Sequence, residues 1–346
     1  MNLTIRLMIK TMNKNKNKPL KITVIGGSGF VGTNLCKALE KSIHEFEIID
    51  LKLSKKFPDK CKIGDIRDLK SLRKTISGEV VINLAAVHRD DIKEISEYQM
   101  TNVNGAKNLT IVCKEKNIQK IIFTSTVAVY GFTDPGTDET GKINPFNDYG
   151  RTKFEAEELL RIWHLEKGNS LIIVRPTVIF GEGNRGNVFN LINQIASGKF
   201  LMIGNGENKK SMAYIDNVVA FLENCIVANK KYAVFNYVDT PDLCMEEFVI
   251  IVRKFLKKKD GVGLRLPFWQ GMIIAYFADF AAKVIGKNLP ISSIRMRKFI
   301  SSTEFQSAKL SLDNFAPPYS LIEGLERTLI SDFINPDPVQ EIFYTE

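Results

Sequence analysis

Short runs rich in β-branched and other apolar residues alternate with helical stretches through the first half of the chain. The runs that predict strands are residues 21–26, 46–50, 60–65, 80–86, 120–125 and 170–176. Strands that alternate with helices are typical of a parallel sheet, because each parallel neighbour needs a crossover connection. The pattern therefore predicts an α/β fold with helices on both faces of the sheet.

The second half of the chain, after Pro176, has a less regular pattern. Glycine-rich turns occur in GEGNRGN and GNGEN, a helix is predicted over residues 215–229, and further helices follow. We find no internal repeat and no low-complexity linker between the halves. We expect a smaller, mostly helical region that shares an interface with the sheet, and the cleft between them is the default ligand site.

The charge and the cysteines limit the classes of ligand. The formal net charge is +9, but the basic residues are spread along the chain, without a zinc-finger, RNP or helix-turn-helix signature. We expect no nucleic-acid partner, and a ligand with a diphosphate explains the charge more simply. Five cysteines without a CxxC pair and three scattered histidines supply no metal-ligand set. We therefore expect no metal, and a cytoplasmic protein with reduced thiols.

One segment, residues 266–286, is apolar over about the length of a bilayer span. Pro267, Gln270, Asp279 and Lys283 interrupt it, which is unusual for a true span. We predict a buried or docking helix and no stable membrane span. An interfacial helix stays open as an alternative, and with it a protein peripheral to the membrane.

A glycine motif, GGSGFVG, directly follows the first predicted strand and opens a helix near Val31. Gly26, Gly29 and Gly32 permit a tight turn, close approach of the backbone to a pyrophosphate and close packing of helix on strand. The motif predicts a doubly wound, Rossmann-type dinucleotide site. Asp50 ends the second strand, where a carboxylate binds ribose hydroxyls and repels a 2′-phosphate, so we predict NAD rather than NADP.

A tyrosine and a lysine further along the chain are the predicted catalytic part of the site. In YGRTK, Tyr149 and Lys153 lie four residues apart at the start of a helical stretch, so their side chains share one face. A tyrosine normally titrates near pH 10, and a neighbouring lysine charge together with an oxidised nicotinamide is expected to lower that pKa toward the working pH. We predict that Tyr149 is an acid/base. The segment FTSTVAVYG, which contains Thr126, lies upstream at the end of the fifth predicted strand.

In these motifs the chain resembles the NAD-dependent epimerase/dehydratase family of extended short-chain dehydrogenases, which includes the UDP-sugar 4-epimerases and 4-keto reductases. The resemblance covers roughly residues 21–327, with GGSGFVG, LAA, FTSTVAVYG, YGRTK and RPTVIFG in the family order. It implies Thr126 as the catalytic hydroxyl, Tyr149 as the base, and Lys153 as the residue that holds the nicotinamide ribose. The cofactor-binding set predicted in all is Gly26, Gly29, Phe30, Val31, Gly32, Asp50, Asp65, Ile66, Ala85, Ala86, Asn102, Tyr149 and Lys153.

The resemblance also implies a substrate end, for which we predict His88, Thr126, Asn187, Val188, Lys210 and Arg295. Lys210 stands where many relatives carry an arginine that binds the diphosphate. The role of His88 is left open, because a histidine there also lines a cleft without contacting substrate. Sugar dehydratases of the family carry an Asp-Glu pair after the catalytic threonine, whereas this chain has Val127 and Ala128, so we expect no dehydration.

These observations lead to one leading hypothesis and two alternatives. We expect an NAD-dependent nucleotide-sugar epimerase or reductase that acts at C4 of a UDP-N-acetylhexosamine or its 4-keto-6-deoxy derivative, with a homodimer left open. The alternatives are a hydroxysteroid or isoprenoid dehydrogenase of the same fold and a non-catalytic NAD-binding interaction protein. The expected parts are a polar tail at 1–18, an NAD-binding Rossmann domain at 19–180 and a mainly substrate-binding region at 181–346, some of whose segments return to the Rossmann domain.

Overall fold

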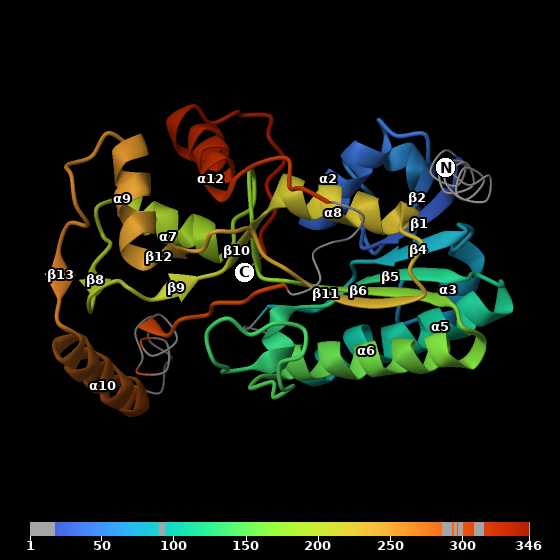
Figure 1. Cartoon of the computed structure of the whole chain (residues 1–346), viewed down its shortest axis with the longest axis horizontal. Coiled ribbons are helices and arrows are strands. Elements are labelled where there is room, and N and C mark those ends of the chain that lie inside the picture. The colour runs from blue at the N-terminus through green and yellow to red at the C-terminus, as the bar shows by residue number, and fades with distance from the viewer. Residues whose placement is uncertain are drawn as a thin grey trace, which may run out of the picture.

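The computed structural model describes residues 18–89, 94–285, 293, 296, 300–307 and 315–345. Seven parallel strands form the central sheet, in the order β11-β6-β5-β4-β1-β2-β3 (Figure 1). They are β1 (Lys21–Ile25), β2 (Glu45–Asp50), β3 (Cys61–Ile63), β4 (Val80–Asn83), β5 (Lys120–Thr124), β6 (Ser170–Pro176) and β11 (Tyr232–Tyr237). This order is that of a doubly wound sheet whose winding reverses between β1 and β4, so the predicted Rossmann-type fold is confirmed.

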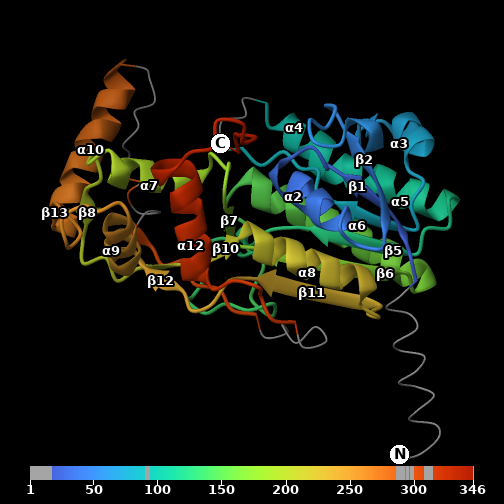
Figure 2. The same ribbon diagram turned by 90° about the horizontal axis from the view of Figure 1, so that it is seen from above.

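Helices cover both faces of the sheet, because the buried strands are apolar on both sides. One face carries α2 (Phe30–Leu39) and α8 (Ile215–Val227), and the other carries α3 (Leu69–Thr75), α5 (Gly105–Glu115) and α6 (Asp148–Lys167), as Figures 1 and 2 show. Successive side chains of β1 point to opposite faces: Val24 belongs to the core under α2 and α8, and Ile25 to the core under α5 and α6. The packing therefore fixes the register of the strand ends that line the site.

The rest of the second half forms an outer region beside the carboxyl ends of the strands. Its helices are α7 (Asn187–Ala196), α9 (Met245–Phe255), α10 (Phe268–Ile285) and α12 (Leu321–Leu329). Three short strand pairs connect them: β7 (Val178–Phe180) with β10 (Met212–Tyr214), β9 (Lys209–Lys210) with β12 (Leu243–Cys244), and β8 (Met202–Ile203) with β13 (Arg265–Leu266). Figure 2 shows α7, α9 and α10 at the opposite end of the molecule from α3 and α5.

All six predicted strands are present, but most end earlier than the apolar runs suggested. β4, for example, stops at Asn83, and the three residues after it leave the sheet. The seventh strand, β11, was not predicted, and it pairs with β6 although it lies in the second half of the chain. The domain boundaries stay a prediction, and residues 1–17 of the expected polar tail lie outside the described residues.

The apolar segment 266–286 forms α10, a helix of 18 residues. Among the residues that the structure describes, no helix is both long and apolar enough to cross a membrane.

Candidate active site

A cavity of about 770 Å³ runs along the carboxyl ends of the strands, where the sheet reverses its winding. Doubly wound sheets bind ligands at this point, because adjacent connections leave it in opposite directions. Most residues predicted from the sequence line the cavity: Gly26, Gly29, Phe30, Val31, Gly32, Asp50, Asp65, Ile66, Ala85, Ala86, His88, Thr126, Tyr149, Lys153 and Asn187. The fold thus brings the predicted cofactor end and the predicted chemical end into one space.

The turn after β1 leaves room for a ligand because it carries glycines. Gly26 has a φ of +80°, and a Cβ atom there would lie 2.7 Å from the backbone nitrogen of Ala85. A Cβ atom at Gly32 would lie 2.4 Å from the carbonyl oxygen of Gly26, too close for α2 to pack on the turn. No side chain caps the N-terminus of α2 at Gly29, so its first N–H groups remain available to an anion. This cradle fits the pyrophosphate of a dinucleotide.

Asp50 and Asp65 lie at the ends of two neighbouring strands and both line the cavity. The Asp50 carboxylate accepts the N–H of Ser28 at 3.0 Å, which ties it to the glycine turn and leaves further lone pairs for ribose hydroxyls. Asp65 is held differently, because the Arg67 guanidinium donates to both of its oxygens. That hydrogen bonding lowers the pKa of Asp65. The geometry is compatible with an adenosine half-site along this wall.

The catalytic candidates come from β5 and α6. Thr126 lies two residues after the end of β5 and caps a short 3₁₀ turn, where its hydroxyl oxygen accepts the N–H of Ala128 at 3.1 Å. Tyr149 lies in the first turn of α6, and Lys153 follows one turn later. The Thr126 side chain lies close enough to Tyr149 to lower the pKa of the phenol by hydrogen bonding. The Lys153 ammonium lies 4.1 Å from the centre of the Phe123 ring, a cation–π distance.

Burial dominates the titration of both catalytic candidates. It raises the pKa of Tyr149 to about 12, against an opposing effect of the Thr126 hydrogen bond. It lowers the pKa of Lys153 to about 7, against an opposing effect of Glu157. The sequence predicted that Lys153 and an oxidised nicotinamide together lower the pKa of the tyrosine. In the protein without NAD, burial of the phenol is the largest cause and raises its pKa instead.

Asn102 is buried and does not line the cavity. Its side-chain oxygen accepts the N–H of Val87 at 2.9 Å, and its amide nitrogen donates to the carbonyl oxygen of Val87 at 3.0 Å. The same nitrogen also donates to the Thr152 hydroxyl at 3.0 Å. Asn102 therefore fixes the segment after β4, which lines the cavity, to the helix that carries Tyr149 and Lys153.

His88 lies at the rim of the cavity, beside the last described residues of the chain. One of its ring nitrogens, Nε2, is 3.1 Å from the carbonyl oxygen of Thr345. Desolvation lowers the pKa of His88, and the charges of Lys153 and Arg89 act in the same direction. The Thr345 hydroxyl in turn donates to the side chain of Asn184 at 2.7 Å. The ring is thus held as a neutral polar group at neutral pH.

The arrangement belongs to a known family. The model of the NAD dependent epimerase/dehydratase family matches residues 22–236, well over half of the chain. The chain is a member of this family. Membership confirms the predicted enzyme class and cofactor: the protein is an NAD-dependent enzyme, which excludes the non-catalytic alternative.

Individual relatives resemble the chain over nearly its whole length. A protein of Escherichia coli O157:H7, N-acetyl-alpha-D-glucosaminyl-diphospho-ditrans,octacis-undecaprenol 4-epimerase, is 43% identical over 94% of this chain and 99% of its own. UDP-glucose 4-epimerase of Vibrio cholerae is 28% identical over 91% and 96%. The solved UDP-N-acetylglucosamine 4-epimerase from Methanobrevibacter ruminantium M1 superposes with a TM-score of 0.72 at 22% identity, over 92% and 99% of the two chains. This last likeness shows the shared fold.

The predicted substrate end of this family member is only partly assembled around the cavity. Asn187 begins α7 and lines the cavity, whereas Val188 is buried in the core beneath it. Lys210 does not line the cavity, and its ammonium donates to the carbonyl oxygen of Ser301 at 2.6 Å. Burial lowers the pKa of Lys210 to about 8. Arg295 lies outside the described residues, so its role, like the others here, stays a prediction.

Several residues of the second half of the chain line the cavity although the sequence did not predict them there. They are Ser211, Thr303, Phe305 and Thr345. The Ser211 hydroxyl oxygen accepts the N–H of Phe305 at 2.8 Å, so the two segments form one wall. No local motif marks these residues, because they reach the cavity only through long-range pairing.

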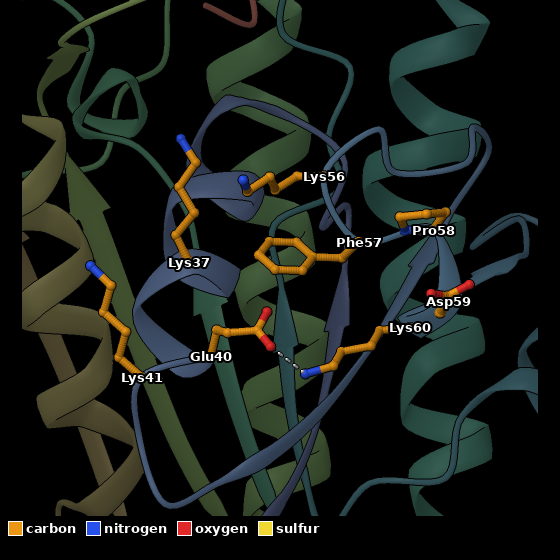
Figure 3. A pocket seen from close by; sticks show the side chains of 8 residues that line it. All are labelled: Lys37, Glu40, Lys41, Lys56, Phe57, Pro58, Asp59 and Lys60. Atoms are coloured by element: carbon orange, nitrogen blue, oxygen red, sulfur yellow. Dashed lines mark hydrogen bonds and ion pairs between the residues drawn. The ribbon is translucent and has the colours of Figure 1, made fainter.

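A second hollow, of about 640 Å³, lies beside the C-terminal end of α2 (Figure 3). Four lysines and Phe57 line much of it, and the Lys60 ammonium is 3.1 Å from the Glu40 carboxylate. It holds none of the predicted site residues, and we assign it no function. The described residues contain no cluster of His, Cys, Asp or Glu that could hold a metal ion.

Proposed function

We propose that the protein is an NAD-dependent 4-epimerase of an N-acetylhexosamine that is joined through a diphosphate to a polyprenol. The observation that carries this proposal is the 43% identity, over 99% of its length, to a relative named for that reaction. The sequence alone predicted the same sugar diphosphate with uridine instead of the lipid. Both substrates present the same reacting end, so the geometry of the cavity supports either one.

Tyr149 would act on the hydroxyl at C4 of the sugar. The positive charge of an oxidised nicotinamide beside Tyr149 would favour the phenolate, which the protein alone does not. The phenolate would then take the O4 proton while Thr126 donates a hydrogen bond to the same region, and Lys153, one helical turn away, would hold the nicotinamide ribose. NAD, when bound, supplies the acceptor of the C4 hydride and returns that hydride afterwards. Tyr149 gives its proton back to O4 when the hydride returns to the opposite face. The C4–H and O4–H bonds are broken and remade, so the reaction needs no net oxidant.

The diphosphate has a binding element at the other end of the cavity. Gly186 and Asn187 line the cavity at the N-terminus of α7, which no side chain caps. Such a terminus offers N–H groups and a favourable dipole to an anion. The polyprenol beyond the diphosphate lies in a bilayer, so the proposal also requires the protein to reach the membrane surface.

Dehydration and reduction are the competing outcomes at this site. Val127 and Ala128 line the cavity and carry no ionisable group, so these two positions supply no acid or base for an elimination. A ketoreductase would use the same Thr126, Tyr149 and Lys153, but it would consume NADH.

The test is incubation of the protein, with catalytic NAD, with N-acetylglucosaminyl diphosphate on a polyprenol and, separately, with UDP-N-acetylglucosamine. We expect the lipid-linked sugar to become the C4 epimer without added NADH, as read by NMR of the released sugar. Tyr149→Phe is the inactive control. Turnover of only the UDP-sugar would show that the substrate is a nucleotide sugar and not the lipid-linked sugar. A 4-keto-6-deoxy product would contradict the argument from Val127 and Ala128.

A further inference from the structure

Helix α10 combines a narrow packed edge with a broad exposed apolar surface. Its packed edge consists of Gly271, Met272 and Ala275, all buried. A Cβ atom at Gly271 would lie 2.8 Å from the side chain of Ile203, so the glycine lets α10 lie close against β8. Figures 1 and 2 show α10 at the end of the molecule farthest from the central sheet.

The exposed surface of α10 carries large apolar side chains along its length. They are Phe268, Trp269, Ile273, Ile274, Tyr276, Phe277, Phe280 and Ile285, each at least 45% exposed, and Phe277 and Phe280 reach 71% and 69%. Isolated exposed apolar residues are ordinary, but a contiguous group on one helix marks an interaction surface. Tryptophan and tyrosine within it are typical of the boundary between membrane and water, where one part of the ring is apolar and the other is wet.

Charge around this surface has one predominant sign. Residues 254–285 carry six basic and two acidic side chains, and Lys254, Lys257, Lys259 and Lys283 are exposed. Arg265 is paired with Glu246, so it adds little to the field. Each basic residue near an apolar helix attracts anionic headgroups by about 1 kcal/mol. A neutral protein partner would gain no such attraction from these residues.

We propose that the exposed face of α10 docks on the surface of a bilayer that contains anionic lipids. The inference rests on the proposed function, because only a lipid-linked substrate gives this enzyme a reason to work at a membrane. The helix lies in the interface with its aromatic side chains among the headgroups, and the lysines before it contact the anionic surface. It does not span the bilayer.

The path of the chain links this face to the active site. After α10 the described chain becomes continuous again at Ile300, and Thr303 and Phe305 then line the cavity. Thr303 also accepts the backbone N–H of Ser211 at 3.0 Å, which joins this segment to the cavity wall. The segment that follows α10 in the sequence therefore forms part of the cavity wall.

The first test is vesicle binding by the whole protein without any polyprenyl substrate. The protein should sediment with vesicles of phosphatidylglycerol and phosphatidylethanolamine. It should bind more weakly to vesicles of phosphatidylcholine, and high salt should weaken its binding to the anionic vesicles. The protein has two tryptophans, Trp163 at 1% exposure and Trp269 at 61%. On vesicle binding we expect the tryptophan fluorescence to shift to shorter wavelength and to become less sensitive to quenching by iodide. Trp269→Phe should remove both changes, because the environment of the buried Trp163 changes little.

The second test uses a pair of matched double variants. Phe277→Ser with Phe280→Ser should weaken vesicle binding about tenfold or more, since it removes two large apolar side chains from the docked face. Ile162→Ser with Leu165→Ser, at 52% and 65% exposure on α6 with the same spacing, should leave binding unchanged. Both variants should keep wild-type turnover of a water-soluble, short-chain analogue of the substrate.

The outcomes separate the docking surface from the proposed reaction. The inference would be overturned if the protein did not bind vesicles, or if both double variants lost binding equally. It would also be overturned if the protein formed a dimer in solution that only the α10 variant dissociates, because a second copy would then cover this face. Binding that behaves as expected in a protein that does not turn over the lipid-linked sugar would refute the reaction and leave the docking surface standing.

Discussion

Replacing Lys153 by methionine should stabilise the protein at neutral pH while it abolishes turnover. Lys153 is 1% exposed, and its burial lowers its pKa from 10.5 to about 7. A shift of this size, at about 1.4 kcal/mol per unit, sets an upper limit of about 5 kcal/mol on the cost of the buried ammonium. Methionine also gives up the contact with the Phe123 ring, worth up to about 2 kcal/mol, so we expect a net gain of about 3 kcal/mol.

The sign of the pH dependence follows from proton counting. Between pH of about 7 and 10.5 the unfolded chain keeps the Lys153 proton that the folded protein has released. The unfolded state therefore binds more protons, and the wild-type stability contributed by this group rises with pH across that window. The advantage of Lys153→Met should be largest at or below pH 7 and shrink toward zero near pH 10.

The assay is urea unfolding of both proteins, freed of NAD, followed by circular dichroism from pH 7 to pH 10. NAD must be removed because a ligand that binds the native state adds its own stability. Lys167→Met is the matched control, since Lys167 is exposed on the same helix and its loss should change stability by less than about 0.5 kcal/mol. A Lys153→Met protein that is less stable than wild type at pH 7, or a difference that does not vary with pH, would refute the reasoning.

The other predictions concern the cofactor and the chemical step. Tyr149→Phe should lower turnover by about 10² to 10⁴, the usual contribution of an acid/base, while NAD affinity by calorimetry stays within a few-fold; near wild-type activity would mean that another base operates. The wild-type protein should bind NAD more tightly than NADP because of the Asp50 carboxylate, and Asp50→Asn should narrow the difference; equal affinities in the wild type would remove Asp50 from this role. Asn102→Ala should destabilise the fold by about 1 to 3 kcal/mol and weaken NAD binding, because the backbone polar groups of Val87 lose their hydrogen-bond partner. Unchanged NAD affinity would show that the segment after β4 keeps its position without Asn102.

The sequence by itself determined the sheet and the cofactor cradle, because both depend on local features. A buried parallel strand must be apolar on both faces, so β1, β2, β4, β5 and β6 were visible as apolar runs, whereas β3 is a short, partly exposed edge strand. The turn at Gly26 and Gly32 admits no Cβ atom, so its glycines were visible as a motif. The spacing of Tyr149 and Lys153 likewise fixed their common helix face. These features need no knowledge of what packs against them.

Only the tertiary structure decided the remaining features, because they depend on which distant segments meet. β11 is partly exposed and follows irregular chain, and it becomes a strand by pairing with β6. Asn102 was assigned to the cofactor by resemblance, whereas its hydrogen bonds to Val87 depend on the return of the chain after β4. Thr345 reaches His88 across most of the sequence. The pKa of Tyr149 shows the same limit: spacing places the lysine on the same helix face, but burial, which the whole fold creates, moves the pKa upward in the protein without NAD.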